Sequence, residues 1–166
     1  METQSEAIQY LSFTLEAEVY ALEIAKVREV LEQGKLTKIP QAPPFMRGVI
    51  NLRGAVVPVV DLKQKFGMGP TVQTVNTCII IVEIEVDGEW LLLGALADSV
   101  REVIELEADQ IEPPPSIGTR LKTEFIKGMG KQDDHFLIIL DLDRVFSLEE
   151  MSQVIEVGVG PLASSE

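Results

Sequence analysis

The side chains most able to carry chemistry in this sequence are carboxylates in its C-terminal part. Asp133 and Asp134 are adjacent, and Asp141 and Asp143 follow a short distance along the chain. Paired carboxylates can act as the general acid and general base of a hydrolase. However, the chain has 27 acidic and 14 basic residues, a net charge of −13, and acids on such a protein usually solvate its surface. An acidic hydrolase is therefore a remote alternative.

The single cysteine and the single histidine add little chemistry. One cysteine, Cys78, cannot form an internal disulfide, and with one histidine the chain lacks multi-cysteine or histidine-rich metal sites. Cys78 opens an apolar stretch, which favours packing over nucleophilic catalysis. His135 has no evident Asp or Ser partner in the sequence, which favours a structural role. Gly128-Met129-Gly130 is followed by Lys131 without the Ser or Thr of a phosphate loop, so we expect neither a metal nor a cofactor.

Charge is distributed unevenly along the chain. Residues 1–75 carry eight basic and eight acidic side chains, whereas residues 76–166 carry six and nineteen. The stretch from Lys26 to Lys65 holds eight basic against three acidic residues, so it is +5 within an acidic protein. The overall charge argues against binding to nucleic acid or to an anionic membrane. The asymmetry fits either ordinary surface scatter or two faces for different protein partners.

Composition and hydropathy indicate a globular, cytoplasmic protein. Of the residues, 46% are hydrophobic and 25% are charged, as is typical of folded domains. The apolar run from Cys78 to Val82 is far shorter than the roughly 20 residues that span a bilayer. The acidic, polar residues 1–6 do not resemble a secretory signal. We therefore expect no membrane insertion.

The hydrophobic pattern predicts short strands joined by tight turns. Residues 10–15 alternate with a period of two, and Arg53-Gly54 and Asp87-Gly88 are typical of hairpin turns. The other expected strands cover residues 19–24, 27–31, 48–52, 55–60, 77–86, 89–96, 100–106 and 135–140. These elements indicate a mainly β fold.

Helices are expected to be few. Asp61 can cap a short helix over residues 62–66, which Gly67 would end. Ser147 to Glu150 fits a capping box, which predicts a C-terminal helix over about 148–157.

An internal repeat organises the strands. The matching segments are 27–30 with 100–103, 45–48 with 125–128, 61–62 with 141–142, and Phe66 with Phe146. We therefore predict two pseudo-symmetric five-stranded β-barrels, one over about 8–68 and the other over about 76–147, in a single domain covering 1–166. Each barrel alone would be marginally stable, so we expect a shared core.

The two copies differ most over residues 49–55 of the first. A loop that carries function has reason to diverge from its counterpart, whereas barrel strands must continue to pack. Alternatively, both loops are solvated hairpin tips that diverge freely.

Several segments carry a family signature. Gly48-Val49-Ile50-Asn51-Leu52-Arg53-Gly54 is followed by Val57-Pro58-Val59-Val60-Asp61-Leu62. Further matching segments cover residues 97–103, 125–129 and 137–142. Over about 8–157 the chain thus resembles the CheW family. The resemblance implies two SH3-like barrels packed together and a non-enzymatic adaptor of bacterial chemotaxis.

The resemblance also implies partners and a location. The adaptor would couple the cytoplasmic tips of methyl-accepting chemoreceptors to the histidine kinase CheA, whose regulatory domain shares this fold. It would be recruited from the cytoplasm to membrane receptor arrays. A detached CheA-type regulatory domain remains the alternative, although the chain's own start and tail argue against a fragment.

The resemblance implies a receptor-facing groove between the two barrels. On matching positions, the groove carries over to Val27, Glu29, Gly48, Arg53, Cys78, Val100 and Val103. The valines are either barrel core or the lining of a trough for the apolar face of a receptor helix. Arg53 is either a solvated turn residue or a donor to a carboxylate. Glu29 could pair with a receptor arginine or with Arg53.

A barrel that holds a small ligand is a further alternative. It would need a cavity with polar walls, whereas side chains are expected to fill barrels of this size.

Overall fold

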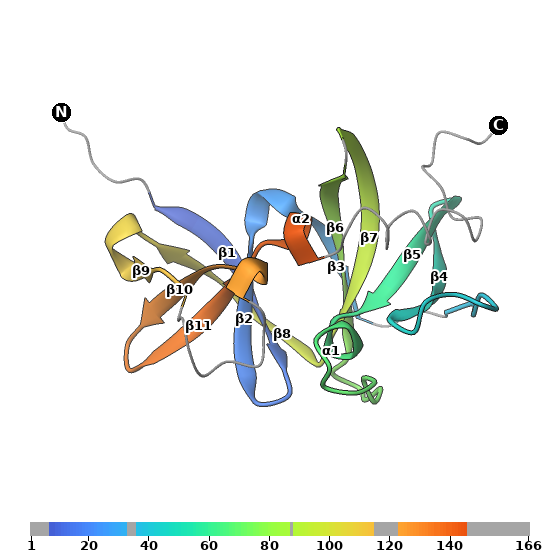
Figure 1. Ribbon diagram of the computed structural model, residues 1–166, viewed down its shortest axis with the longest axis horizontal. Coiled ribbons are helices and arrows are strands. Elements are labelled where there is room, and N and C mark those ends of the chain that lie inside the picture. The colour runs from blue at the N-terminus through green and yellow to red at the C-terminus, as the bar shows by residue number, and fades with distance from the viewer. Residues whose placement is uncertain (1–6, 33–35, 87, 115–122, 146–166) are drawn as a thin grey trace.

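The computed structural model describes residues 7–32, 36–86, 88–114 and 123–145 (Figure 1). The strands are β1 Ile8–Leu15, β2 Glu18–Glu23, β3 Val27–Leu31, β4 Met46–Leu52, β5 Ala55–Asp61, β6 Cys78–Val86, β7 Glu89–Ala97, β8 Ser99–Leu106, β9 Ile111–Glu112, β10 Ile126–Gln132 and β11 His135–Leu140. Two short α-helices, α1 Leu62–Lys65 and α2 Leu142–Val145, and 3-10 turns at Ile24–Lys26, Ala108–Gln110 and Thr123–Phe125 complete this part of the chain.

The strands form two sheets that lie side by side (Figure 1). The six-stranded sheet has the order β8-β1-β2-β11-β10-β9, and the five-stranded sheet has the order β3-β6-β7-β5-β4. The predicted mainly β fold with two SH3-like, barrel-like halves is confirmed, but one sheet has six strands rather than the expected five, because the two-residue strand β9 adds to its edge.

The sheets are related residue by residue, as the repeat predicts. Val27 pairs with Val82 in the five-stranded sheet, and Val100 pairs with Phe13 in the other. The β4–β5 and β10–β11 ladders both shift register at a glycine, Gly48 or Gly128. Val27 and Val100 therefore occupy equivalent positions.

Each sheet contains a hairpin that the repeat had assigned to the other predicted subdomain. Hairpin β1–β2 pairs with β8 and β11, whereas hairpin β6–β7 pairs with β3 and β5. The observed sheets thus differ from the predicted subdomains 8–68 and 76–147, because residues 8–23 complete the sheet that strands 99–140 build. The five-stranded sheet is built from consecutive strands, β3 to β7, whereas the six-stranded sheet combines residues 8–23 with strands 99–140. The six-stranded sheet can therefore form only when these two distant parts of the chain come together.

Two strands are not predicted from the sequence. β10 contains two glycines and several polar residues, which weaken a strand pattern. β9 is two residues long, and its pairing of Glu112 with Met129 has a counterpart in an isolated bridge between Thr37 and Val49. The C-terminal helix expected over 148–157 lies outside the described residues.

The largest hydrophobic cluster takes side chains from both sheets, which agrees with a shared core. Phe13, Leu15 and Leu22 come from the six-stranded sheet, and Ile80 and Val82 from the five-stranded one. A smaller cluster lies within each sheet. Burial across the junction makes each half dependent on the other.

Asp61 fixes the start of α1, as the sequence predicts. Its fully buried carboxylate accepts hydrogen bonds from the backbone N–H groups of Lys63 and Gln64. It also accepts from Arg47 at 2.7 Å and from the amide and hydroxyl of Thr71 at 2.8 and 2.6 Å. The carboxylate thereby ties α1, β4 and the loop before β6 together.

Candidate functional site

An ion pair joins the outer strands of the five-stranded sheet. Arg53 lies in the β4–β5 turn and donates from Nη1 and Nη2 to the Glu29 carboxylate on β3, at 2.7 and 2.9 Å. Because β3 and β4 are the edges of this sheet, the pair helps to close it into a barrel. The hydrogen bonds from Arg53 lower the pKa of Glu29, and those same bonds raise the pKa of Arg53.

The conformation of the turn aims Arg53 at Glu29. Arg53 and Gly54 have φ values of 54° and 87°, as in the type I′ turns that match the twist of a hairpin. The Arg53 side chain is 72% exposed and Glu29 is 27% exposed. Of the two sequence-based interpretations of Arg53, the structure supports the donor to a carboxylate, and its partner is Glu29 of the same chain.

Gly48 allows a second closure of the same barrel. Thr37 and Val49 exchange two backbone hydrogen bonds of 2.9 Å, which bring residue 37 against β4. A Cβ on Gly48 would lie 2.5 Å from the Thr37 carbonyl oxygen, and its φ of +151° is one that side chains disfavour. Gly48 is buried, so its role in the site is to shape the wall.

The valines differ in exposure. Val27 and Val100 are partly buried and pack against the shared core, at the starts of β3 and β8. Val103, farther along β8, is 50% exposed. Its counterpart on β3 is Val30, which is 36% exposed and was not among the predicted site residues. The repeat of Val-Arg-Glu-Val was a signal that could have identified Val30.

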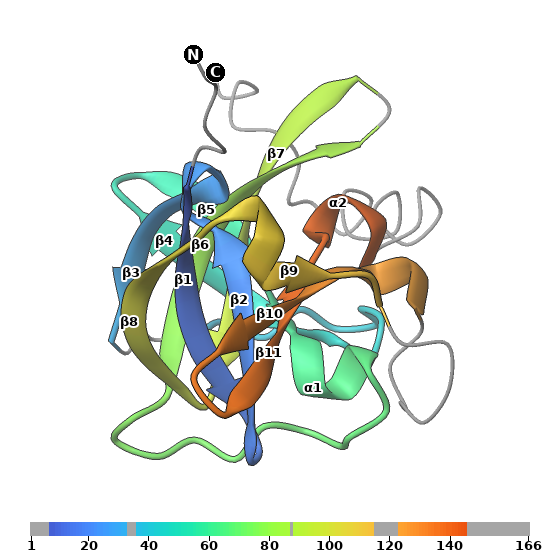
Figure 2. The ribbon, with the colours of Figure 1, turned by 90° about the vertical axis from the view of Figure 1, so that its left-hand side faces the viewer.

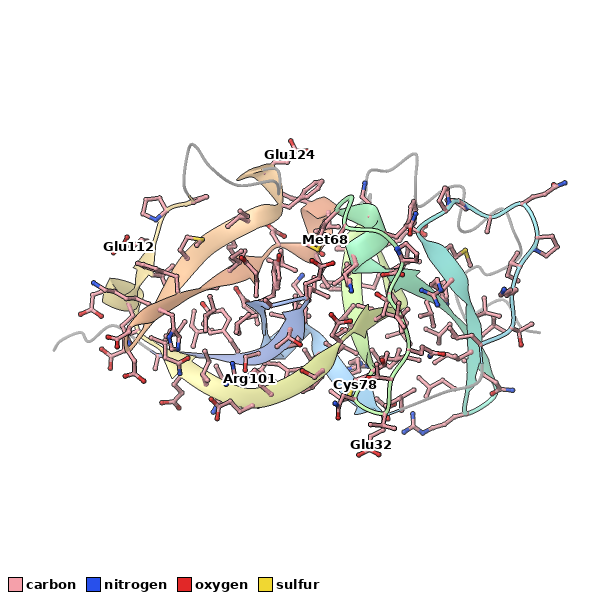
Figure 3. The ribbon with its side chains drawn as sticks, turned by 90° about the horizontal axis from the view of Figure 1, so that it is seen from below. Glu32, Met68, Cys78, Arg101, Glu112 and Glu124 are labelled. Atoms are coloured by element: carbon pink, nitrogen blue, oxygen red, sulfur yellow. The ribbon has the colours of Figure 1, made fainter. Side chains whose placement is uncertain are left out.

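Cys78 lies where the two sheets meet. It starts β6, and a backbone hydrogen bond links its thiol to Val100 on the other sheet. Burial raises the pKa of the Cys78 thiol, and the nearby Glu32 carboxylate raises it further, against the effect of the Val100 hydrogen bond. A protonated thiol is a poor nucleophile, which favours a packing role. Figure 3 shows Cys78 and Glu32 at this junction, with Glu112 at the far end of the six-stranded sheet.

The predicted site residues therefore fall into two groups. Glu29, Gly48 and Arg53 form the closure of the five-stranded barrel, whereas Cys78 and Val100 meet at the junction of the sheets. Figure 2 shows β3 and β8 along the same side of the molecule, with Val27 on β3 and Val100 and Val103 on β8. This side combines half-exposed valines with the Glu29–Arg53 pair.

The candidate carboxylates of a hydrolase have other partners. Asp143 accepts from Lys26 at 2.6 Å and from the Glu85 backbone N–H, and Asp141 contacts Arg144 at 3.7 Å. Among the described residues, no three His, Cys, Asp or Glu side chains are grouped as metal ligands would be. No helix in the described part of the chain is long and apolar enough to cross a bilayer.

Comparisons with known proteins agree on one family. Residues 9–150 match the CheW-like domain. The chain is 36% identical to chemotaxis protein CheW of Klebsiella aerogenes over 149 residues, which covers 90% of this chain and 87% of that protein. It is 31% identical to chemotaxis protein CheW of Bacillus subtilis over 147 residues, covering 86% and 89%. The crystal structure of scaffolding protein TtCheW from Thermoanaerobacter tengcongensis matches with a TM-score of 0.78 and 40% identity, over 87% of this chain and 96% of that one.

Proposed function

This chain belongs to the CheW family of chemotaxis coupling adaptors, and on that premise we propose that it links transmembrane chemoreceptors to the histidine kinase CheA. Its partners are the cytoplasmic tips of methyl-accepting receptors and the regulatory domain of the kinase. It acts in the cytoplasm at membrane receptor arrays. It binds and positions these partners without catalysis or a cofactor.

The receptor interface comprises Val27, Glu29, Gly48, Arg53, Cys78, Val100 and Val103. The observation that carries this assignment is the ion pair between Glu29 and Arg53 on the side that also presents the β3 and β8 valines. An amphipathic receptor helix would place its apolar face on the valines. A paired arginine with a mostly exposed side chain retains donors for a receptor carboxylate.

The shared core supports an adaptor that acts as one rigid unit. Because the largest hydrophobic cluster takes side chains from both sheets, a partner bound to one sheet is mechanically connected to a partner on the other. Residues 1–166 then form a single CheW-like domain. Signals would pass as shifts among bound states of receptor, adaptor and kinase.

The test is a binding assay with purified components. The chain is immobilised and exposed to a receptor cytoplasmic tip fragment, to a CheA regulatory domain, and to both together. We expect each partner to bind alone and both to bind at once. Binding of only one partner, or mutually exclusive binding, would contradict a coupling role.

A further inference from the structure

A polar cavity opens at one end of the six-stranded barrel. It has a volume of about 170 Å³, and its polar walls are Ser12, Arg101, Glu102, Gln132, Asp133 and His135. Val19 and Leu137 form its apolar part. The cavity departs from the expectation that side chains fill such a barrel. It is smaller than the roughly 300–1,000 Å³ of typical small-molecule pockets, and its size suits one long side chain.

The equivalent positions of the five-stranded barrel carry apolar residues where the cavity has polar ones. The shared register makes Ile81 the counterpart of Ser12, and Leu52 the counterpart of Gln132. Ile81 and Leu52 lie in one hydrophobic cluster, and Ile81 is completely buried. The polar lining of the cavity therefore arises from sequence differences between the two halves, while the backbone pairing is the same.

The equivalent positions in the five-stranded barrel indicate which group can pair with the acidic side chains of the cavity. Glu102 corresponds to Glu29, and Asp133 corresponds to Arg53, with nearly the same backbone φ of 53° and 54°. In the five-stranded barrel, the guanidinium of Arg53 makes two hydrogen bonds to Glu29. In the six-stranded barrel, the turn supplies a second carboxylate instead, so the position next to Glu102 lacks the guanidinium of its counterpart.

The remaining charge in the cavity does not oppose a cation. Arg101 offsets one of the two carboxylates, so the Asp, Glu and Arg side chains of the walls together carry a net negative charge. The counterpart of Arg101 is Arg28, which pairs with Glu83 at 3.2 Å while Arg53 pairs with Glu29.

We propose that this cavity is a binding site for the guanidinium group of an arginine side chain that a protein partner presents. The arginine would pair with Glu102 and Asp133 and lay its aliphatic part on Val19 and Leu137. The site lies in the six-stranded sheet, so it does not include the Glu29–Arg53 pair, although Arg101 and Glu102 stand between the proposed receptor residues Val100 and Val103 on β8. Planar guanidinium is favoured over ammonium because carboxylates bind it through two parallel hydrogen bonds.

His135 allows the site to be observed directly, because it is the only histidine in the chain. N-acetyl-arginine methylamide is titrated into the full chain at low ionic strength and constant pH, and the imidazole proton signals are followed by NMR. The single tryptophan, Trp90 on β7 of the other sheet, serves as an internal control. We expect saturable shifts of His135 at millimolar probe concentration, without shifts of Trp90.

The neutral isostere N-acetyl-citrulline methylamide should bind at least about tenfold more weakly, because it lacks the charge-assisted bonds. Equal binding of the two probes, or the absence of a saturable His135 shift, would overturn the proposal. Tighter binding of free arginine than of the blocked probe would assign the site to an amino acid rather than to a protein partner, and this result would also overturn it.

Two variants test whether the arginine probe binds in the cavity. Asp133→Arg should place its own guanidinium beside Glu102, as Arg53 does beside Glu29, and should remove the response to the probe. Glu102→Gln should weaken binding of the arginine probe about tenfold. The matched control is Glu105→Gln, an exposed carboxylate on the same strand but outside the cavity, which should bind as wild type. An unchanged response in Asp133→Arg, with its fold verified by circular dichroism, would refute the assignment.

Discussion

Arg53 and Glu29 form a bidentate ion pair between the β4–β5 turn and β3 of the five-stranded barrel, with N–O distances of 2.7 and 2.9 Å. The pair connects a turn to an edge strand that lies 24 residues earlier in the sequence. Both side chains remain partly or mostly exposed to solvent, so a partner can reach them. The predictions for this pair separate its role in folding from its role in binding.

Replacement of Arg53 by alanine should weaken receptor binding while leaving the fold intact. An exposed ion pair contributes little to stability, so we expect the Tm to fall by no more than about 3 °C. The affinity for a receptor tip fragment should fall about tenfold or more, because a charged contact at an interface is lost. Binding to the kinase regulatory domain should change less. A large fall in Tm would make Arg53 a structural residue, and unchanged receptor affinity would remove it from the site.

The ion pair should make stability depend on pH in the acidic range. Hydrogen bonds from Arg53 lower the pKa of Glu29, so the pair stabilises the folded state above the ordinary glutamate pKa of about 4.3. This contribution should disappear as the pH falls through the lowered pKa of Glu29. Urea unfolding of wild type and Glu29→Gln from pH 7 to 2 measures it. The two curves should converge at low pH, and a gap that persists there would contradict the prediction.

Gly48→Ala should destabilise the protein by about 2–4 kcal/mol, because its Cβ would meet the rigid carbonyl of Thr37 at 2.5 Å. Gly128→Ala is the matched control in the other sheet. There the nearest atom is a flexible side-chain methyl of Ile111 at 2.7 Å, and the nearest backbone oxygen is at 3.2 Å. Urea unfolding should show a clearly smaller loss for Gly128→Ala. Equal losses would show that the close approach to Thr37 is not the cause.

Asp61→Asn should cost about 2–4 kcal/mol of unfolding free energy, because the new amide N–H₂ would face several buried donors and would remove the partner of Arg47. Asp141→Asn tests the same substitution at the equivalent position. Asp141 is 29% exposed and contacts Arg144 at 3.7 Å, so its loss should stay within about 0.5 kcal/mol. Chemical unfolding of both variants checks the difference, and similar losses would count against the role of the Asp61 network.

Val103→Asp should abolish apolar receptor contact with little effect on stability, because Val103 is already half exposed. The affinity for a receptor tip fragment should fall about tenfold or more. Val30→Asp replaces the equivalent residue on β3, and its affinity for the receptor fragment measures whether both edge strands contact the receptor. If Val103→Asp binds the receptor fragment as wild type, Val103 does not belong to the interface.

The repeat in the sequence was sufficient to predict two related halves and the equivalence of Val27 with Val100. The matching segments adopt matching local structure, and the β4–β5 and β10–β11 ladders shift register at equivalent glycines. The turn at Arg53-Gly54 and the helix cap at Asp61 were also predictable, because each depends on neighbouring residues.

Only the tertiary structure decided how the halves combine. Hairpin β1–β2 pairs with β8 and β11, which lie far from it in the sequence, and local patterns do not encode such pairing. The structure also decided that Glu29 is the partner of Arg53, because the sequence was compatible with a carboxylate of the same chain and with one of a receptor. The cavity beside Glu102 could not be predicted from the sequence for a related reason. It results from Ser12, Glu102 and Asp133 converging from three parts of the chain, and convergence is a property of packing rather than of sequence order.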